Sequence, residues 1–167
     1  MTTIKLLILD VDGVLTDGRL PYASEGCESK TFFVQDGGAL RLWLSSGGEA
    51  AVISGRQSPV VDTRCKELGV RQLVQGVSDK VPAYEKIRDE ALVSDEAIAY
   101  VGDDLLDIAP MQRCGYPIAV ANALPTVKRV ARYVTRRRGG EGAVAEAVER
   151  IMRHNGTWAA ALNRIES

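Results

Sequence analysis

Residues 4–9 are almost entirely apolar, and an acidic stretch with a glycine follows them at once, beginning at Asp10. A short run of this kind is typical of a strand covered on both faces, as strands are in a parallel sheet. The apolar run alone would also suit a buried helix, but the turn-forming residues after it favour a strand. No other part of the sequence constrains the fold as strongly.

From Asp36 onward, helix patterns alternate with strand patterns. This alternation predicts an α/β fold, a doubly wound parallel sheet with helices on both faces. A β-rich piece at residues 31–34 further predicts a β-hairpin flap after the first strand. Strands are expected at about 4–9, 50–53, 70–74, 97–101 and 117–120, and helices are expected to begin near residues 36, 58, 79, 104, 125, 143 and 157.

Length and composition predict a single domain spanning residues 1–167. The chain has 167 residues, of which 46% are hydrophobic and 26% charged, and these values are ordinary for a globular domain. A domain of this size buries roughly 70% of its unfolded surface and needs no disulfides for a core. Within it, the flap is expected at about residues 18–34 and a C-terminal tail at about 135–167.

Charge and cysteine usage exclude several classes of partner. A formal net charge of -1 offers no basic excess for a nucleic-acid backbone. The three cysteines, Cys27, Cys65 and Cys114, are odd in number and widely spaced, which favours reduced thiols. The apolar run near the start is too short for a membrane span or a signal peptide. We therefore expect a cytoplasmic protein without nucleic-acid or membrane partners.

Two acidic clusters stand at expected strand ends. Asp10 and Asp12 follow the first strand, and Asp103, Asp104 and Asp107 follow the strand near residues 97–101. Open parallel sheets bind ligands at the carboxyl ends of their strands. If the five carboxylates meet, a cation is needed to offset their repulsion. Because all donors are oxygens, the sequence predicts Mg²⁺.

Two further residues at strand ends suit an anion. Ser54 follows the strand expected at 50–53, and Lys80 stands at the start of an expected helix. A hydroxyl, nearby backbone N–H groups and an ammonium together suit a phosphate dianion. The inferred ligand is therefore a phosphate ester.

With these residues in view, the chain resembles the haloacid dehalogenase superfamily of phosphatases over nearly its whole length. Residues 12–18, a Phe-x-x-x-Asp-Gly stretch at 32–38 and the short chain also resemble the 3-deoxy-D-manno-octulosonate 8-phosphate phosphatase family. Four motifs occur in order: the Asp-x-Asp-Gly motif at residues 10–13, Ser54, Lys80, and the Gly-Asp-Asp-x-x-Asp motif at residues 102–107.

The resemblance implies a role for each matching residue. Asp10 is implied as the nucleophile that forms an aspartyl phosphate, and Asp12 as the group that protonates the leaving oxygen and later activates water. The implied Mg²⁺ ligands are the Asp10 side chain, the Asp12 backbone carbonyl and Asp103. Lys80 is implied as a catalytic and phosphate-binding residue.

The remaining site residues also follow from the resemblance. Ser54, Gly55 and Arg56 are implied in binding phosphate and substrate, and Arg56 suits bidentate contact with a sugar-acid carboxylate. Asp104 and Asp107 are implied as supporting residues that hold the waters of the metal and orient Lys80.

The implied activity is Mg²⁺-dependent hydrolysis of a phosphorylated sugar acid, 3-deoxy-D-manno-octulosonate 8-phosphate, in lipopolysaccharide biosynthesis. Members of this small type lack a cap domain. A homotetramer replaces the cap, and the flap of one subunit and the C-terminal tail of a neighbour close the pocket. We therefore expect a homotetramer without a cap domain.

One departure from the family pattern leaves the substrate open. Glu141 stands where the tail commonly carries a basic residue, so a sialic-type 9-phosphate or another small phosphate ester is an alternative. Arg136, Arg137 and Arg138 are then alternative sources of positive charge. A receiver domain and a non-catalytic oligomerisation module are the rival classes, and the retained acids favour a phosphatase over both.

Overall fold

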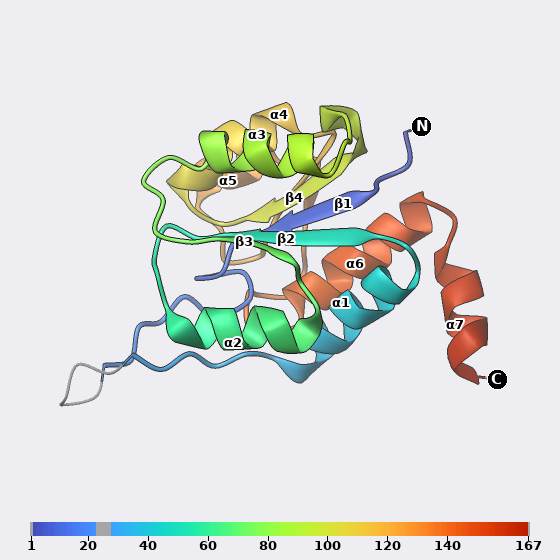
Figure 1. Cartoon of the computed structure of the whole chain (residues 1–167), viewed down its shortest axis with the longest axis horizontal. Helices are drawn as coiled ribbons and strands as arrows, with labels where there is room; N and C mark the ends of the chain where they lie inside the picture. Colours follow the sequence, from blue (N-terminus) through green and yellow to red (C-terminus); the bar gives the residue numbers. More distant parts are fainter. Residues whose placement is uncertain (1, 23–27, 167) are drawn as a thin grey trace.

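A computed structural model of the chain describes residues 2–22 and 28–166. Its core is one sheet of six parallel strands in the order β3-β2-β1-β4-β5-β6 (Figure 1). This confirms the predicted doubly wound parallel sheet. The strands are β1 (Leu6–Leu9), β2 (Glu49–Ile53), β3 (Gln72–Val74), β4 (Ile98–Gly102), β5 (Tyr116–Ala119) and β6 (Tyr133–Val134).

Helices cover both faces of this sheet. In Figure 1, α3, α4 and α5 lie above the sheet, whereas α1, α2 and α6 lie below it, and α7 lies beside α6. The helices are α1 (Val34–Ser45), α2 (Pro59–Leu68), α3 (Val81–Glu90), α4 (Ile108–Arg113), α5 (Pro125–Val130), α6 (Ala143–His154) and α7 (Trp158–Glu166), with 3-10 turns η1 (Asp95–Ala97) and η2 (Leu105–Asp107).

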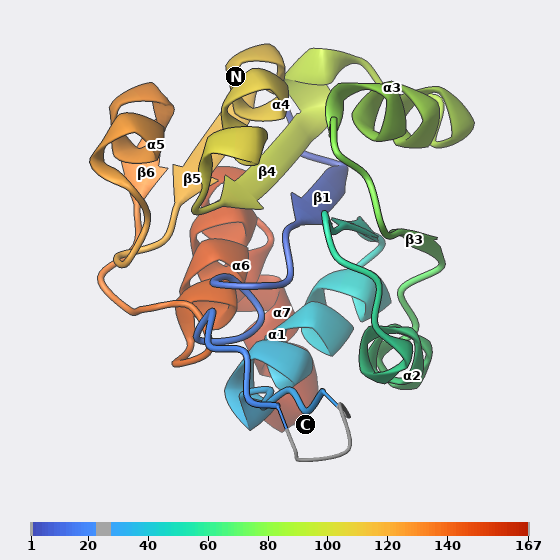
Figure 2. The same cartoon turned by 90° about the vertical axis from the view of Figure 1, so that its left-hand side faces the viewer.

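The continuous apolar character of the first strand follows from its place in the sheet. β1 lies between β2 and β4, and all four of its residues are fully buried. From β1 the chain continues through α1 to β2 on one side, and it reaches β4 on the other side only after α3. Connections diverge here, so a crevice for a ligand is expected at the carboxyl ends of β1 and β4, which Figure 2 faces.

The residues at the ends of α2 and α3 have the roles that the sequence predicts for them. Ser58 and Pro59 begin α2, and Gly69 ends it in the left-handed region at φ 81°. The N-cap of α3 is Lys80, and the carboxylate of Asp79, one residue earlier, accepts a hydrogen bond at 2.9 Å from the backbone N–H of Val81, the first residue of the helix. The predictions for these two helices are confirmed.

The predicted strand at residues 31–34 is wrong. Between β1 and α1, the described residues contain no strand and only one antiparallel bridge, between Tyr22 and Glu28. Phe32 instead packs against the core, with the guanidinium of Arg64 over its ring, and Val34 already begins α1. Residues 23–27, with Cys27, lie outside the described part of the flap.

Two further elements differ from the prediction. The helix expected to begin near residue 104 is divided into the turn η2 and the short helix α4. β6 was not predicted, because two residues are too few to show a periodicity. Cys65 and Cys114, by contrast, are free buried thiols, as expected for reduced cysteines.

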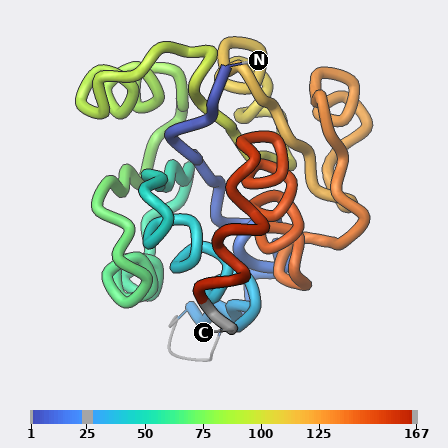
Figure 3. The backbone as a smooth tube through the Cα atoms, turned by 90° about the vertical axis from the view of Figure 1, so that its right-hand side faces the viewer, coloured from blue at the N-terminus to red at the C-terminus, as the bar shows by residue number. Residues whose placement is uncertain are grey.

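The end of the molecule opposite the carboxyl ends of the strands carries both chain ends. Figure 3 faces this end and shows α7 running across it beside α6. Among the described residues, no helix is both long and apolar enough to cross a membrane.

Candidate active site

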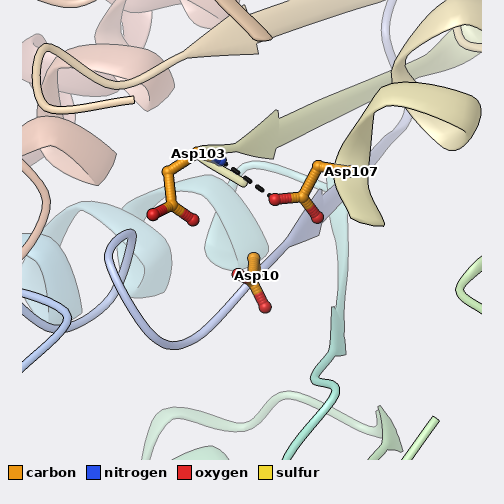
Figure 4. Close-up of side chains that lie close together, drawn as sticks. All are labelled: Asp10, Asp103 and Asp107. Carbon is orange, nitrogen blue, oxygen red and sulfur yellow. Dashed lines mark hydrogen bonds between the residues drawn. The ribbon is translucent and has the colours of Figure 1, made fainter. Parts of the chain in front are cut away.

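Three carboxylates from distant parts of the chain meet at the carboxyl end of the sheet (Figure 4). Asp10 follows β1, Asp103 follows β4, and Asp107 ends η2. One carboxylate oxygen from each lies within 4.8 Å of the others. The two acidic clusters of the sequence therefore form one site, because β1 and β4 are neighbours that end at the same edge.

Lys80 lies among these acids. Its Nζ is 2.7 Å from Oδ1 of Asp10 and 2.7 Å from Oδ1 of Asp107, and only 2% of the residue is exposed. Burial alone would lower the pKa of Lys80, but the charges of Asp10 and Asp107 outweigh burial and raise it. The ammonium therefore stays charged, in a position to meet an anion beside Asp10.

Asp107 is held by four donors. Its Oδ1 accepts from Lys80 and from the hydroxyl of Tyr100 at 2.8 Å. Its Oδ2 accepts from the backbone N–H groups of Asp103 and Asp104 at 3.0 and 3.1 Å. These four bonds use the lone pairs of a fully buried carboxylate. Asp107 therefore organises the site, and Asp10 and Asp103 are left to hold a cation.

The other two acids carry the electrostatic signature of a cation site. Burial, with the charge of Asp107, raises the pKa of Asp10 to about 6. Burial, with the charge of Asp10, raises the pKa of Asp103 to about 8. Oδ1 of Asp103 is buried and has no hydrogen-bond partner among the described residues. Two crowded carboxylates with an unpartnered oxygen fit a hard divalent cation.

Asp104 serves the backbone of η2. Its Oδ1 accepts from the N–H of Leu105 at 2.7 Å, and it forms a capping box with Asp107. This contact fixes the turn that carries Asp107. Asp104 therefore supports the cluster of Asp10, Asp103 and Asp107 without belonging to it.

Ser54, Gly55 and Arg56 form the rim after β2. Ser54 is buried, and its Oγ accepts from the N–H of Arg56 at 3.2 Å. The side chain of Arg56 points to the flap, because its Nη2 donates to the hydroxyl of Tyr22 at 3.0 Å and its Nε lies 4.0 Å from Oδ2 of Asp12. Arg56 therefore lies beside Asp12 and not within the cluster of Asp10, Asp103 and Asp107.

The start of the C-terminal tail packs on the loop after β1. The side chain of Asn122 donates to the carbonyl of Gly13 at 3.2 Å and accepts from the N–H of Gly139 at 2.7 Å. A β-carbon on Gly139 would lie 1.7 Å from that carbonyl, which explains the glycine. Glu141 is exposed nearby and has no side-chain partner among the described residues.

The run of arginines at residues 136–138 lies away from the acid cluster. The backbone N–H groups of Arg136 and Arg137 donate to the carboxylate of Glu146, and the guanidinium of Arg137 donates to Gln35 at 2.9 Å. Both arginines line a groove formed with α1 and α6, and none of the clustered acids lines it. Arg138 is exposed and makes no side-chain contact with the acid cluster.

Sequence reasoning missed three residues that shape this site. Tyr100 holds Asp107, Asn122 joins the tail to the loop after β1, and Lys30 of the flap contacts the carboxylate of Asp12. A hydroxyl within the apolar run at 98–101 was a usable signal for Tyr100. The other two contacts bridge residues that nothing in the sequence pattern connects.

The crossover topology and the Asp-Lys cluster define a hydrolase of the haloacid dehalogenase type. The family model for haloacid dehalogenase-like hydrolases matches residues 40–148, and the chain belongs to this family.

More specific similarity is found among curated and solved proteins. The chain is 44% identical over 149 residues to the 3-deoxy-D-manno-octulosonate 8-phosphate phosphatase KdsC of Escherichia coli K12, covering 89% of this chain and 79% of that protein. It is similar to the phosphatase of the same name from Moraxella catarrhalis, solved with magnesium, phosphate and KDO, with TM-score 0.94, 40% identity and coverage of 97% and 93%. The cobalt-bound enzyme from Haemophilus influenzae has TM-score 0.90, 37% identity and coverage of 93% and 91%.

Proposed function

We propose that this protein is a Mg²⁺-dependent phosphatase that hydrolyses 3-deoxy-D-manno-octulosonate 8-phosphate through a phospho-aspartate. The observation that carries the proposal is the 44% identity to KdsC over 89% of the chain. The solved relative with magnesium, phosphate and KDO supports both the metal and the class of substrate.

Asp10 and Asp103, with the backbone carbonyl of Asp12, are the proposed holders of Mg²⁺. Their oxygen donors and the raised pKa values of the two carboxyl groups support this assignment. When bound, the ion screens the negative charge between a carboxylate and a phosphate and polarises the phosphoryl oxygens. Asp104 and Asp107 support the site through the hydrogen bonds that fix η2.

In the proposed reaction, a carboxylate oxygen of Asp10 attacks phosphorus, and the bond from phosphorus to the ester oxygen breaks. The electron pair of that bond leaves with the ester oxygen, which takes a proton from Asp12. Asp12 then removes a proton from a water whose oxygen bonds to phosphorus, and the bond from phosphorus to the Asp10 oxygen breaks, which releases phosphate and restores the carboxylate of Asp10. Lys80, already charged and 2.7 Å from Asp10, balances the charge of the phosphoryl group during both steps.

Three residues at the rim are proposed to bind the substrate. Ser54 and the backbone of Gly55 suit the phosphate, because β2 ends at the same edge of the sheet as β1. Arg56 suits the carboxylate of the sugar acid, since its guanidinium lies beside the proposed proton donor, with Nε 4.0 Å from Oδ2 of Asp12. Glu141, which is exposed and unpaired in the described structure, contributes no positive charge to this recognition.

The proposal extends to assembly and location. We propose one phosphatase domain without a cap, in a cytoplasmic homotetramer whose subunits close one another's pockets with flap and tail. The large side chains of Tyr22 in the flap and Val34 at the start of α1 are exposed, which supports an interface there. The partner implied for the site is a phosphorylated sugar acid.

Phosphate release from a panel of ulosonate phosphates, with and without Mg²⁺, tests this function. We expect the highest kcat/KM for the 8-phosphate of the octulosonate and almost no turnover without the ion. Asp10→Asn is expected to abolish turnover, whereas the exposed Asp89→Asn serves as the matched control. A higher kcat/KM for a nine-carbon 9-phosphate would show that the proposed substrate is wrong. Turnover by Asp10→Asn at the parent rate would refute the phospho-aspartate mechanism.

A further inference from the structure

Lys30 belongs to the flap but is buried against the active site. It lies in the extended segment before α1, outside the sheet, and only 1% of its side chain is exposed. Its Nζ donates to Oδ1 of Asp12 and lies 2.8 Å from Oε1 of Glu28. A lysine so completely buried needs carboxylate partners, and one of the two used here is a residue of the site.

The two oxygens of Asp12 have different surroundings. Oδ1 is bound by Lys30, while Oδ2 is buried without a hydrogen-bond partner and lies 4.0 Å from Nε of Arg56. That Nε is also buried and without a partner. One oxygen is therefore held in place by a hydrogen bond, whereas the other has only the ion pair with Arg56 and keeps its lone pairs free of hydrogen bonds.

Glu28 in turn holds the ammonium group of Lys30 in place. Its Oε1 contacts Lys30, and its Oε2 accepts from Nη2 of Arg56 at 3.4 Å. Arg56 follows β2, so Glu28 links the flap to the rigid sheet. A lysine held on one side by a carboxylate that is itself anchored loses little freedom when it binds a second carboxylate.

We propose that Lys30 is a positioning residue for proton transfer by Asp12. It holds Oδ1 in one place, so that Oδ2 is left to meet the ester oxygen of a bound substrate, and the carboxylate keeps one orientation through both proton transfers. The inference rests on the proposed function, in which Asp12 donates the proton to the leaving ester oxygen. Lys30 acts through Asp12 and contacts neither phosphorus nor the ester oxygen.

Dependence on the leaving group tests this role. A sugar leaves as an alkoxide and needs the proton, whereas p-nitrophenolate is stable without it. We expect Lys30→Met to lower kcat/KM for the sugar-acid phosphate about ten- to hundredfold, and kcat/KM for p-nitrophenyl phosphate only slightly, since general acid catalysis supplies about 10²–10⁴ in rate. Lys30→Arg, which keeps the charge, is expected to recover much of the loss.

Three controls separate positioning from other roles. The exposed Lys86→Met on α3 is the matched variant and is expected to behave as the parent. The inhibition constant of the released sugar acid is expected to stay unchanged in Lys30→Met, because Lys30 does not bind the sugar. In an Asp12→Asn background, Lys30→Met is expected to add no further loss.

Several results would overturn the inference. Equal losses of kcat/KM with both esters would show that Lys30 is a structural or phosphate-binding residue. A larger inhibition constant for the sugar acid in Lys30→Met would show that Lys30 binds the substrate. An unchanged kcat/KM of Lys30→Met for the sugar-acid phosphate would show that Lys30 has no role in proton transfer by Asp12. If the parent protein releases phosphate from neither ester, the proposed function itself fails, and this inference fails with it.

Discussion

Gly13 and Asp103 lie so close together that a β-carbon on Gly13 would stand 2.0 Å from Oδ2 of Asp103. Gly13 also has φ +93°, a left-handed conformation that other residues rarely adopt. The loop after β1 therefore approaches the carboxylate after β4 only because position 13 has no side chain. This contact joins the two acidic motifs, which stand about ninety residues apart.

Gly13→Ala is therefore expected to lower the Mg²⁺ affinity at least about tenfold, because a methyl group displaces the carboxylate of Asp103, a proposed ligand. Isothermal titration with Mg²⁺ measures the effect. Gly38→Ala is the control, since a β-carbon there meets no atom within 4 Å. Unchanged Mg²⁺ affinity in Gly13→Ala would show that Asp103 does not hold the ion.

Tyr100→Phe removes the hydroxyl that donates to Asp107 at 2.8 Å. We expect a loss of about 1.5–3 kcal/mol in the free energy of unfolding, because a buried hydrogen bond to a charged group is lost. We also expect kcat to fall severalfold, since Lys80 is held by the same oxygen of Asp107. Urea unfolding and steady-state kinetics measure the two effects.

Tyr84→Phe is the matched control for this prediction. The hydroxyl of Tyr84 donates to Asp95 at 2.8 Å, and the residue is buried on α3. Its backbone N–H donates to the carbonyl of Lys80 at 2.9 Å, a bond that Phe keeps, so the substitution changes only the hydroxyl that points to Asp95. We expect a similar loss of stability with no change in kcat. If both variants keep full activity, Asp107 does not need Tyr100 to orient Lys80.

Mg²⁺ binding is expected to strengthen as the pH rises from about 6 to about 8. Without the ion, burial and the negative charge of neighbouring acids, Asp107 for Asp10 and Asp10 for Asp103, raise the pKa of Asp10 to about 6 and that of Asp103 to about 8, so protons must leave when the cation binds. Titration in buffers of different ionisation enthalpy counts the released protons. Affinity independent of pH over this range would contradict the assignment of these two ligands.

The same shifts predict an opposite trend in stability for the protein without metal. Both folded pKa values lie above the unfolded value of 3.8, so the folded state binds more protons, and stability contributed by these groups is lost as the pH rises from about 4 to about 8. Thermal unfolding across this range measures the slope. Asp103→Asn is expected to reduce it, because one of the two titrating groups is removed.

The sequence predicted the part of the fold that depends on local signals. The apolar run of β1 and the proline and glycine at the ends of α2 follow from short-range physics, and the alternation of elements then dictated the sheet. Because β1 and β4 end at one edge, the same reasoning also anticipated that Asp10 and Asp103 would lie together.

Contacts between distant segments could not be predicted in this way. The aromatic pair at residues 32–33 has the composition of a strand, yet Phe32 packs against the core beneath Arg64, because burial there outweighs β-propensity. The contacts of Lys30 with Asp12 and of Asn122 with Gly139 depend on how the flap and the tail fold over the sheet, which no local pattern encodes.

Asp36 provides the last prediction, because it stands inside α1 and yet caps a different helix. It is buried, and its Oδ1 accepts from the N–H of Ala145, in the first turn of α6, at 2.7 Å. Asp36→Ala is expected to cost about 1–2 kcal/mol of stability, as loss of an N-cap does. It is also expected to speed hydrogen exchange in the first turn of α6 and in the preceding tail loop. Asp36→Asn, which keeps an acceptor, should lose less, and the exposed Asp62→Ala on α2 is the control. Exchange in the tail loop that is unaffected by Asp36→Ala would mean that the tail is held by its own hydrogen bonds to the loop after β1, through Asn122 and from the N–H of Gly140 to the carbonyl of Val14, and not by the start of α6.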